Sequence, residues 1–334
     1  MSKKKKHYPG KVWVGFDLGG TKMLAKVFND DYQTLGRAKQ KTRGNKGSMA
    51  GLSRMVTVIE EALEDAGATA DQVMGIGVGC PGPINPTTGV LVEAPNLGWE
   101  NVHVEEHLGH AFDCRVVICN DVDAGVYAEF HEGAARDARC AVGIFPGTGI
   151  GAGAVIDGRL LQGANLSCME LGHIPLYPET SGHGENGSTL ELECSRLKIA
   201  SEAARAAYRG QAPNLLKSCG TDMSNITSGK LAAAVEAGDI EIENIIIRAA
   251  TLLGCGVATI VHLLSPDKIV LGGGLVEAMP ELYVSTVRES ARERTLPAYH
   301  GTYEIVAAEL EDDAGVLGCV AWARKNIEEQ VGSY

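Results

Sequence analysis

Two glycine-rich turns, each containing a threonine, stand at corresponding places in two similar halves of the 334-residue chain. The first is Gly19-Gly20-Thr21-Lys22, with Asp17 just before it, and the second is Gly147-Thr148-Gly149. Glycine has no Cβ, so backbone N–H groups in such turns can approach phosphate oxygens closely. The threonines add hydroxyl donors, the lysine adds a positive charge, and the aspartate offers oxygen to Mg²⁺ through water. The two turns therefore predict a phosphate-binding site.

Three glycine patterns imitate nucleotide-binding motifs, but none has the context that the motif needs. Residues 77–82 form a literal GxGxxG, yet the prolines that follow forbid the helix that must begin there. Residues 147–152 fit the looser GxGxxA form but lead into a predicted strand. Residues 15–22 place threonine before lysine, where a P-loop has the reverse order. An ordinary β-turn is the alternative for any one loop, and two equivalent loops favour phosphate binding.

One carboxylate, Asp121, is placed to act as a general base. It follows a predicted strand that ends at Asn120, and a helix is expected directly after it. This position aims the side chain into a cleft, where it can accept a proton. The common alternative for an aspartate at a strand–helix junction is to cap the helix. Asp123 is interpreted as a first-turn acid that interacts favourably with the helix dipole.

The chain repeats one pattern, in which a strand, a glycine turn, a returning strand and an acidic turn follow one another. The pattern occurs at residues 12–31 and again at residues 140–158, which suggests a duplicated α/β unit with a cleft between the copies. Alternating strands and helices imply a largely parallel, covered sheet in each half. We expect a small domain over residues 1–122 and a large domain over residues 123–312. A final helix within residues 313–334 is expected to pack back on the small domain.

The remaining elements are predicted from hydrophobic periodicity and from residues that end helices and strands. Ser48 is expected to cap a helix over residues 48–66. Further strands are expected at residues 73–78, 115–119, 268–271 and 303–308. Further helices are expected at residues 122–133, 189–208, 241–264, 277–293 and 313–328.

Charge and composition exclude several classes of function. The formal net charge of −12 argues against a nucleic-acid partner and leaves an anionic substrate to local capture. No uninterrupted apolar run reaches the ~18–20 residues that a membrane helix needs. The basic stretch at residues 3–6 has no apolar run of a secretory signal behind it. The nine cysteines form no CxxC pair, so we expect reduced thiols in a cytoplasmic protein.

Taken together, these motifs resemble the ROK family of sugar kinases and related repressors. Besides the two glycine turns and the Asn120-Asp121 pair, the chain has Glu170-Leu171-Gly172-His173 and a segment that ends in Gly272-Gly273-Gly274, all in the family's order. The resemblance spans roughly residues 11–328. It implies a ribonuclease H-like, actin-type fold whose two domains close on ATP, Mg²⁺ and a hexose. It also implies Asp121 as the catalytic base and a homodimer.

The resemblance assigns the substrate contacts as well. The positions that contact the hexose in the family correspond here to Asn96, Asn120, Glu170, His173 and Glu191. The positions against the adenosine of ATP correspond to Gly272, Gly273 and Gly274. Structural roles are the alternatives: a turn residue for Asn96, a core histidine for His173, a solvated helix acid for Glu191 and a tight strand–helix connection for the glycines.

The chain departs from the family in one place. Many ROK proteins have a zinc loop that uses a histidine and three cysteines just before the position of Glu191. Here the cysteine positions hold Gly182, Gly184 and Thr189, and the nearby His183 cannot replace three thiolates. We therefore expect no structural zinc, and the sugar preference is less well defined.

Three classes of function are compared. An ATP-dependent glucokinase that makes glucose 6-phosphate is favoured, with fructose, mannose, allose or an N-acetylated amino sugar as alternative substrates. A non-catalytic sugar-binding protein is disfavoured because Asp121 and both glycine turns are present. An NAD-dependent oxidoreductase is disfavoured because no helix follows the GxG loops. ROK repressors carry a helix-turn-helix before the kinase core, and we expect none here because the first strand begins near residue 11.

Overall fold

The computed structural model describes residues 7–177, 188–310 and 314–331. The strands of the first half and of the segment that follows it are β1 (Val12–Leu18), β2 (Lys22–Phe28), β3 (Thr34–Lys41), β4 (Val73–Cys80), β5 (Ile84–Asn85), β6 (Val90–Ala94), β7 (Trp99–Val102) and β8 (Arg115–Asn120). The later strands are β9 (Cys140–Pro146), β10 (Ile150–Ile156), β11 (Arg159–Leu160), β12 (Pro175–Tyr177), β13 (Ser188–Thr189), β14 (Lys268–Leu271) and β15 (Glu304–Ala307).

The α-helices cover both halves of the chain. Those of the first half are α1 (Ser48–Ala66), α2 (Val104–Phe112) and α3 (Asp121–His131). The later helices are α4 (Leu190–Cys194), α5 (Arg196–Tyr208), α6 (Pro213–Cys219), α7 (Ser228–Glu236), α8 (Ile240–Leu264), α9 (Gly274–Ala278), α10 (Pro280–Arg294) and α11 (Ala314–Val331).

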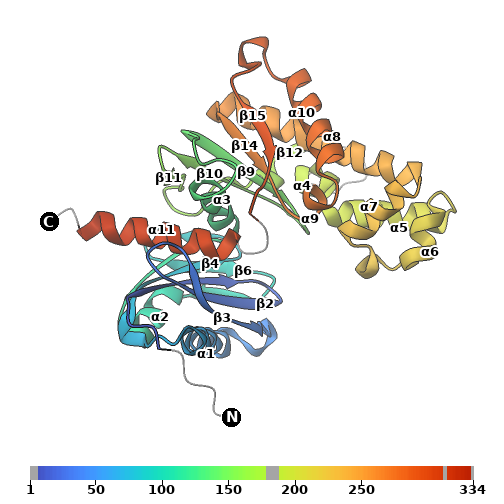
Figure 1. The fold of residues 1–334 in the computed structure, drawn as a ribbon. Coiled ribbons are helices and arrows are strands. Elements are labelled where there is room, and N and C mark those ends of the chain that lie inside the picture. Colours follow the sequence, from blue (N-terminus) through green and yellow to red (C-terminus); the bar gives the residue numbers. More distant parts are fainter. Residues whose placement is uncertain (1–6, 178–187, 311–313, 332–334) are drawn as a thin grey trace. The chain divides into compact units, whose positions relative to one another are not determined.

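Two five-stranded sheets share one construction (Figure 1). The first has the order β3-β2-β1-β4-β8, with β1 antiparallel to β2 and parallel to β4. The second has the order β11-β10-β9-β14-β15, with β9 antiparallel to β10 and parallel to β14. The expectation of largely parallel sheets is wrong, and both sheets are mixed. The reason is that each glycine turn joins its two strands directly, and a short turn can join only antiparallel neighbours.

The chain divides into two compact units. The first contains residues 1–136, 159–168 and 310–334, and the second contains residues 137–158 and 169–309. The first unit thus includes α3, which follows the Asn120-Asp121 pair, and the terminal helix α11.

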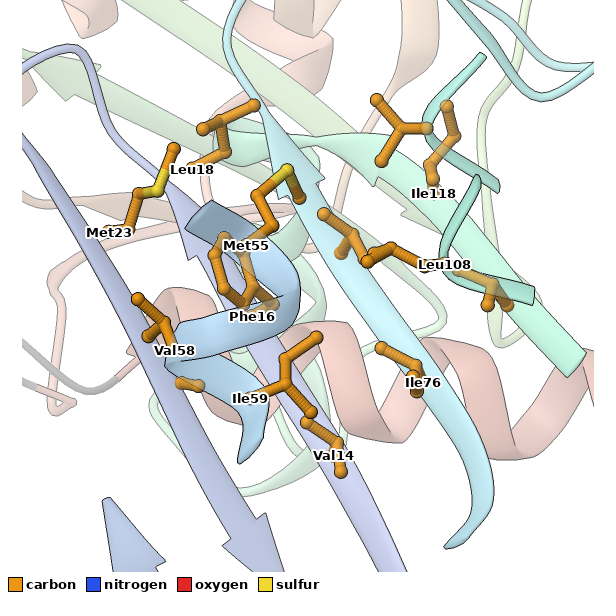
Figure 2. Packing of buried hydrophobic residues seen from close by; sticks show 14 of the residues in the cluster. Val14, Phe16, Leu18, Met23, Met55, Val58, Ile59, Ile76, Leu108 and Ile118 are labelled. Atoms are coloured by element: carbon orange, nitrogen blue, oxygen red, sulfur yellow. The ribbon is translucent and has the colours of Figure 1, made fainter. Parts of the chain in front are cut away.

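In the first unit, alternate residues of β1 face opposite sides of the sheet, as the period of a strand requires. Val14, Phe16 and Leu18 are fully buried in a cluster with Met55 and Ile59 of α1. Figure 2 shows these side chains packed between α1 and the strands. On the opposite face, Trp13 packs with apolar residues of α11. The sheet is therefore covered on both faces, and β1, β4 and β8 run parallel, so that they end at one edge.

Glycines allow α11 to lie against this sheet at very short range. A Cβ at Gly15 of β1 would collide with the carbonyl oxygen of Val316, and one at Gly77 of β4 with that of Cys319. A Cβ at Gly318 of α11 would in turn collide with the carbonyl oxygen of Ala124 in α3. These positions have no room for any larger residue unless the backbone moves.

Helix α8 is the one described helix whose length and composition would suit a membrane span. Its apolar window is 61% buried inside the protein. The helix packs against α10, α4 and α5 of the second unit, and Figure 1 shows α8 and α10 side by side. We therefore interpret α8 as the core helix of that unit.

The local predictions are confirmed to within a few residues, with three corrections. Gly47, with φ 87°, is the N-cap of α1, and Ser48 is the first helical residue. The helix expected over residues 189–208 is two helices, because Ser195 ends α4 and caps α5. The helix expected over residues 277–293 is also two, because Pro280 starts a new helix after α9.

Candidate active site

The first glycine turn lies in the hairpin between β1 and β2. The carbonyl of Gly19 accepts a hydrogen bond from the Thr42 hydroxyl at 2.6 Å, and the carbonyl of Thr21 accepts one from the Thr42 N–H at 2.9 Å. Thr42 is fully buried, so the turn is held from beneath by the residue that follows β3. Gly20, Thr21 and Lys22 are exposed. The turn therefore presents backbone N–H groups and a hydroxyl on a fixed base, which suits an anion.

Asp17 and Asp121 are brought together by the parallel strands. Asp17 pairs in register with Gly79 of β4, and Gly79 pairs with Cys119 of β8, two residues before Asp121. Both carboxylates are partly exposed. Burial, and next the negative charge of Asp121, raise the pKa of Asp17 to about 7. The ionised form of Asp17 is thus disfavoured, and a bound cation would favour it.

Asn120 is the N-cap of α3, so the capping role considered for Asp121 belongs to Asn120. The Asn120 side-chain oxygen accepts from the N–H groups of Val122 at 2.8 Å and Asp123 at 3.4 Å. Its amide donates to the carbonyl of Gly82 at 3.2 Å. Asp121 is the first helical residue, and its carboxylate accepts from the Val122 N–H at 3.0 Å. Among the residues that the structure describes, the Asn120 amide donates only to Gly82, so its second N–H can bond a ligand.

Asn96 lies at the exposed tip of the turn between β6 and β7. A Cβ at Gly20 would lie 3.5 Å from the Asn96 Cβ, so this tip is next to the first glycine turn. Buried Trp99 anchors the hairpin and donates to the carbonyl of Gly44 at 3.3 Å. The first unit therefore gathers Asp17, Gly20, Asn96, Asn120 and Asp121 at one end of its sheet.

The second glycine turn connects β9 to β10, and Glu191 of α4 lies directly against it. A Glu191 carboxylate oxygen accepts from the Ile150 N–H at 2.8 Å. A Cβ at Gly149 would collide with the same oxygen, so a larger residue there would displace the Glu191 carboxylate. Glu191 also lies beside Gly172, where a Cβ would be 3.3 Å from the Glu191 Cβ. The acid thus ties the turn to the segment that carries Glu170 and His173.

Glu170 is the N-cap of a short 3₁₀ turn, Leu171–His173, and His173 is its last residue. Leu171 and Gly172 are buried while Glu170 and His173 are exposed, and the His173 N–H donates to the Glu170 carbonyl at 3.0 Å. Met169, just before them, has φ 66°, in the left-handed region that few residues adopt. His173 is therefore no core histidine, and both polar side chains are presented to solvent or ligand.

The triple glycine follows β14 and passes beside the second glycine turn. A Cβ at Gly272 would lie 2.5 Å from the Phe145 ring, and one at Gly273 would lie 3.2 Å from the Pro146 carbonyl. Gly273 has φ 87° and is the N-cap of α9. Gly274 lines a cavity of about 600 Å³ together with Arg196, Ser224, Thr227, Ser228 and Glu277. The second unit therefore places the triple glycine, the second turn and a nucleotide-sized cavity in one neighbourhood.

Of the positions considered for zinc, only Thr189 lies within the described residues. Gly182, His183 and Gly184, on which the expected absence of zinc depends, lie outside the described residues, and that expectation stays a prediction. Among the described residues no group of three or more His, Cys, Asp and Glu side chains could hold a metal ion. Thr189 caps α4 by accepting from the Leu192 N–H at 3.3 Å.

The sequence interpretation missed Arg196 and the serine and threonine side chains of the cavity that Gly274 lines.

Comparison with known proteins shows the family to which this chain belongs. The ROK family matches residues 13–326, and the chain belongs to the ROK family. It is 30% identical to a glucokinase of Thermotoga maritima over 96% of this chain and 98% of that one. It is 28% identical to a glucokinase of Halalkalibacterium halodurans over 96% of each chain. It is also 27% identical to a xylose repressor of Caldicellulosiruptor bescii over 92% of this chain and 77% of that one.

Solved structures agree on the fold. A ROK hexokinase from Thermus thermophilus superposes with a TM-score of 0.77 at 29% identity, over 95% of this chain and 99% of that chain. A ROK glucokinase from Streptomyces griseus, solved with glucose and AMPPNP, gives a TM-score of 0.80 at 24% identity, over 94% and 99%. The chain therefore has the two-unit α/β fold of ROK and actin-like ATPase structures, and its family contains both sugar kinases and regulators.

Proposed function

We propose that this protein is an ATP-dependent hexokinase of glucokinase type, which converts glucose to glucose 6-phosphate. The observation that carries the proposal is the pair Asp17 and Asp121 at the strand ends beside the first glycine turn. Asn120 rather than Asp121 caps α3, and we assign Asp121 the role of the base. The relatives with glucokinase names, matched over nearly their whole length, support the same activity.

In the proposed reaction, Asp121 accepts the proton of the sugar's primary hydroxyl as that oxygen attacks the γ-phosphate in line. Glu191, Glu170, His173 and Asn120 orient the sugar ring, since carboxylates, imidazoles and amides bond vicinal hydroxyls. One Glu191 oxygen is engaged by Ile150, which leaves the other for a hydroxyl. The two glycine turns hold the phosphates, and Gly274 and its cavity receive the adenosine.

The residues present fit a divalent cation. Asp17 would hold Mg²⁺ through water. Burial, and next the charge of Asp121, raise the pKa of its carboxyl, and a cation would stabilise the ionised form. When bound, Mg²⁺ supplies charge neutralisation on the phosphates. This chain's own part is to keep Asp17 on the rigid end of β1, next to the base.

The second candidate function is a sugar-binding regulator without kinase activity, because the chain also resembles a xylose repressor. The direct test is to measure ADP release with a panel of glucose, fructose, mannose, allose and N-acetylated amino sugars, and to identify the product by NMR. We expect Mg²⁺-dependent ADP release that is fastest with glucose, with phosphate on O6. Tight sugar binding without ADP release would instead support the regulator, and fastest turnover of another sugar would move the assignment to that hexose.

The family resemblance also suggests a cytoplasmic homodimer. Sedimentation velocity at micromolar protein concentration should give the mass of two chains. A mass of one chain, 35.2 kDa, under assay conditions would contradict the dimer.

A further inference from the structure

Arg196 is a cation joined to the second glycine turn through two hydrogen bonds. It is the first residue of α5, directly after the N-cap Ser195. Its backbone N–H donates to the carbonyl of Gly147 at 2.9 Å. Its guanidinium donates to the hydroxyl of Thr148 at 3.2 Å, and the same residue lines the cavity that contains Gly274. The side chain thus stands where the turn and the cavity meet.

Within the described part of the chain, the Arg196 guanidinium has no ion-pair partner. Among the described residues no carboxylate forms an ion pair with it, whereas Lys198, two residues on, lies 3.4 Å from Glu202. The first turn of α5 contains no acid, so the guanidinium also faces the positive end of that helix's dipole. A cation in this position lacks electrostatic compensation that a bound anion would supply.

We propose that Arg196 binds the phosphate chain of the nucleotide and thereby makes the cavity selective for nucleoside polyphosphates over nucleosides. The inference rests on the proposed kinase function and adds a residue to the same site. The planar guanidinium can keep its bond to Thr148 and still direct other N–H groups at phosphate oxygens. Glu277 lines the same cavity and would repel phosphate, so the phosphates belong at the Arg196 and Thr148 end.

The net charge of −12 favours a local cation at a phosphate site. The field of the whole chain repels ATP, so affinity must come from local donors. Backbone N–H groups of the glycine turns contribute partial charges, and Arg196 contributes a full charge beside them.

The test compares nucleotide binding by Arg196→Gln and Arg196→Lys with that of the unchanged protein. Calorimetric titrations use AMPPNP, ADP and adenosine. Arg205→Gln is the matched control, because Arg205 is an exposed arginine in the last turn of the same helix. We expect Arg196→Gln to weaken AMPPNP binding by about 10- to 100-fold, the range for a lost charge-assisted bond. Adenosine affinity and the KM for sugar should not change, and Arg196→Lys should recover part of the loss.

Several outcomes would overturn the inference. Arg196→Gln could bind AMPPNP as tightly as the unchanged protein, or it could lose adenosine and AMPPNP equally, which indicates a purely structural role in holding the turn. A lysine variant as weak as the glutamine variant would also reject the role of charge. If the unchanged protein binds no nucleotide at all, the proposed kinase function itself fails. If it phosphorylates sugar while the Arg196 variants behave like Arg205→Gln, only this inference fails.

Discussion

At the scale of single residues, the proposed kinase activity depends on two acids that lie in one small region. Asp17 and Asp121 reach it from β1 and from the start of α3, and the charge of one opposes ionisation of the other. Burial is the larger cause of the raised Asp17 pKa, and the Asp121 charge is the second. Such an arrangement costs stability in the free protein and favours a cation or a proton in the site.

This cost predicts a pH dependence of stability. The unfolded-state pKa of Asp17 is 3.8 and the folded-state pKa is about 7, so the folded protein binds the extra proton between these values. The free energy of unfolding contributed by this group therefore falls as pH rises through that window. Asp17→Asn should match the unchanged protein near pH 4 and exceed it by about 1–2 kcal/mol at pH 8, allowing for partial exposure. Urea denaturation without Mg²⁺ measures this.

The control for Asp17→Asn is Asp31→Asn, at an exposed aspartate after β2. It should leave the pH profile unchanged. Equal stability of Asp17→Asn and the unchanged protein at both pH values would show that Asp17 carries no such penalty. Turnover of Asp17→Asn should fall, because the same carboxylate is assigned to Mg²⁺.

The sequence indicates which side chains lie near the glycine turns but not which hydrogen bonds they form. Asn120 and Asp121 were both placed at the strand end, yet the capping bond belongs to Asn120 because its oxygen reaches the Val122 N–H. Arg196 was missed because its role depends on Thr148, 48 positions away in the chain. One signal was present: a basic residue stands at the start of a helix, where acids are preferred.

At the scale of elements, the first unit is held together where glycines allow backbones to approach. Gly318 of α11 faces the carbonyl of Ala124 in α3, the helix that begins at Asp121. The position of the base therefore depends on how closely α11 packs. Gly315, one turn earlier in the same helix, has open space where a Cβ would be.

The matched pair Gly318→Ala and Gly315→Ala tests this packing. Alanine at 318 should lower the free energy of unfolding by about 1–3 kcal/mol, because the collision involves backbone atoms that cannot rotate away. Alanine at 315 should be neutral or stabilising by up to about 1 kcal/mol, since alanine favours helices. Urea unfolding of both variants decides the matter. Equal midpoints would mean that α11 does not pack closely on α3.

The hairpins could be predicted from the sequence because a glycine turn between two apolar runs is a local signal. The expectation of largely parallel sheets fails only at the hairpin side of each sheet, where two of the pairings in the first sheet are antiparallel. Ser195 and Pro280 divide helices that periodicity alone had joined. In both cases a capping or breaking residue outweighed a continuous apolar pattern.

At the scale of the whole molecule, the two sheets repeat one plan, in which a glycine hairpin is followed by two parallel strands on one side. This duplication was predictable because the same order of elements appears twice along the chain. The sequence does not show as directly which elements form one unit. Residues 310–334 belong to the first unit through contacts with residues that are far from them in the sequence.

The net charge gives a prediction at this scale that separates the kinase from the regulators in the family. With −12 formal charges, the protein should show no binding to a 30-base-pair duplex at 150 mM salt, measured by fluorescence anisotropy at protein concentrations up to about 100 μM. Phosphate repulsion is the reason. Binding that weakens steeply as salt rises would indicate a basic surface and would favour a regulator.

The most direct measurement of the central claim is single-turnover phosphorylation by Asp121→Asn beside calorimetric glucose binding by the same variant, with Asp31→Asn as control. The account predicts glucose affinity close to that of the unchanged protein and a phosphorylation rate lower by about 10²–10⁴-fold, the usual contribution of a general base. A variant that binds glucose and phosphorylates it at nearly the original rate would contradict the assignment of Asp121 as the base.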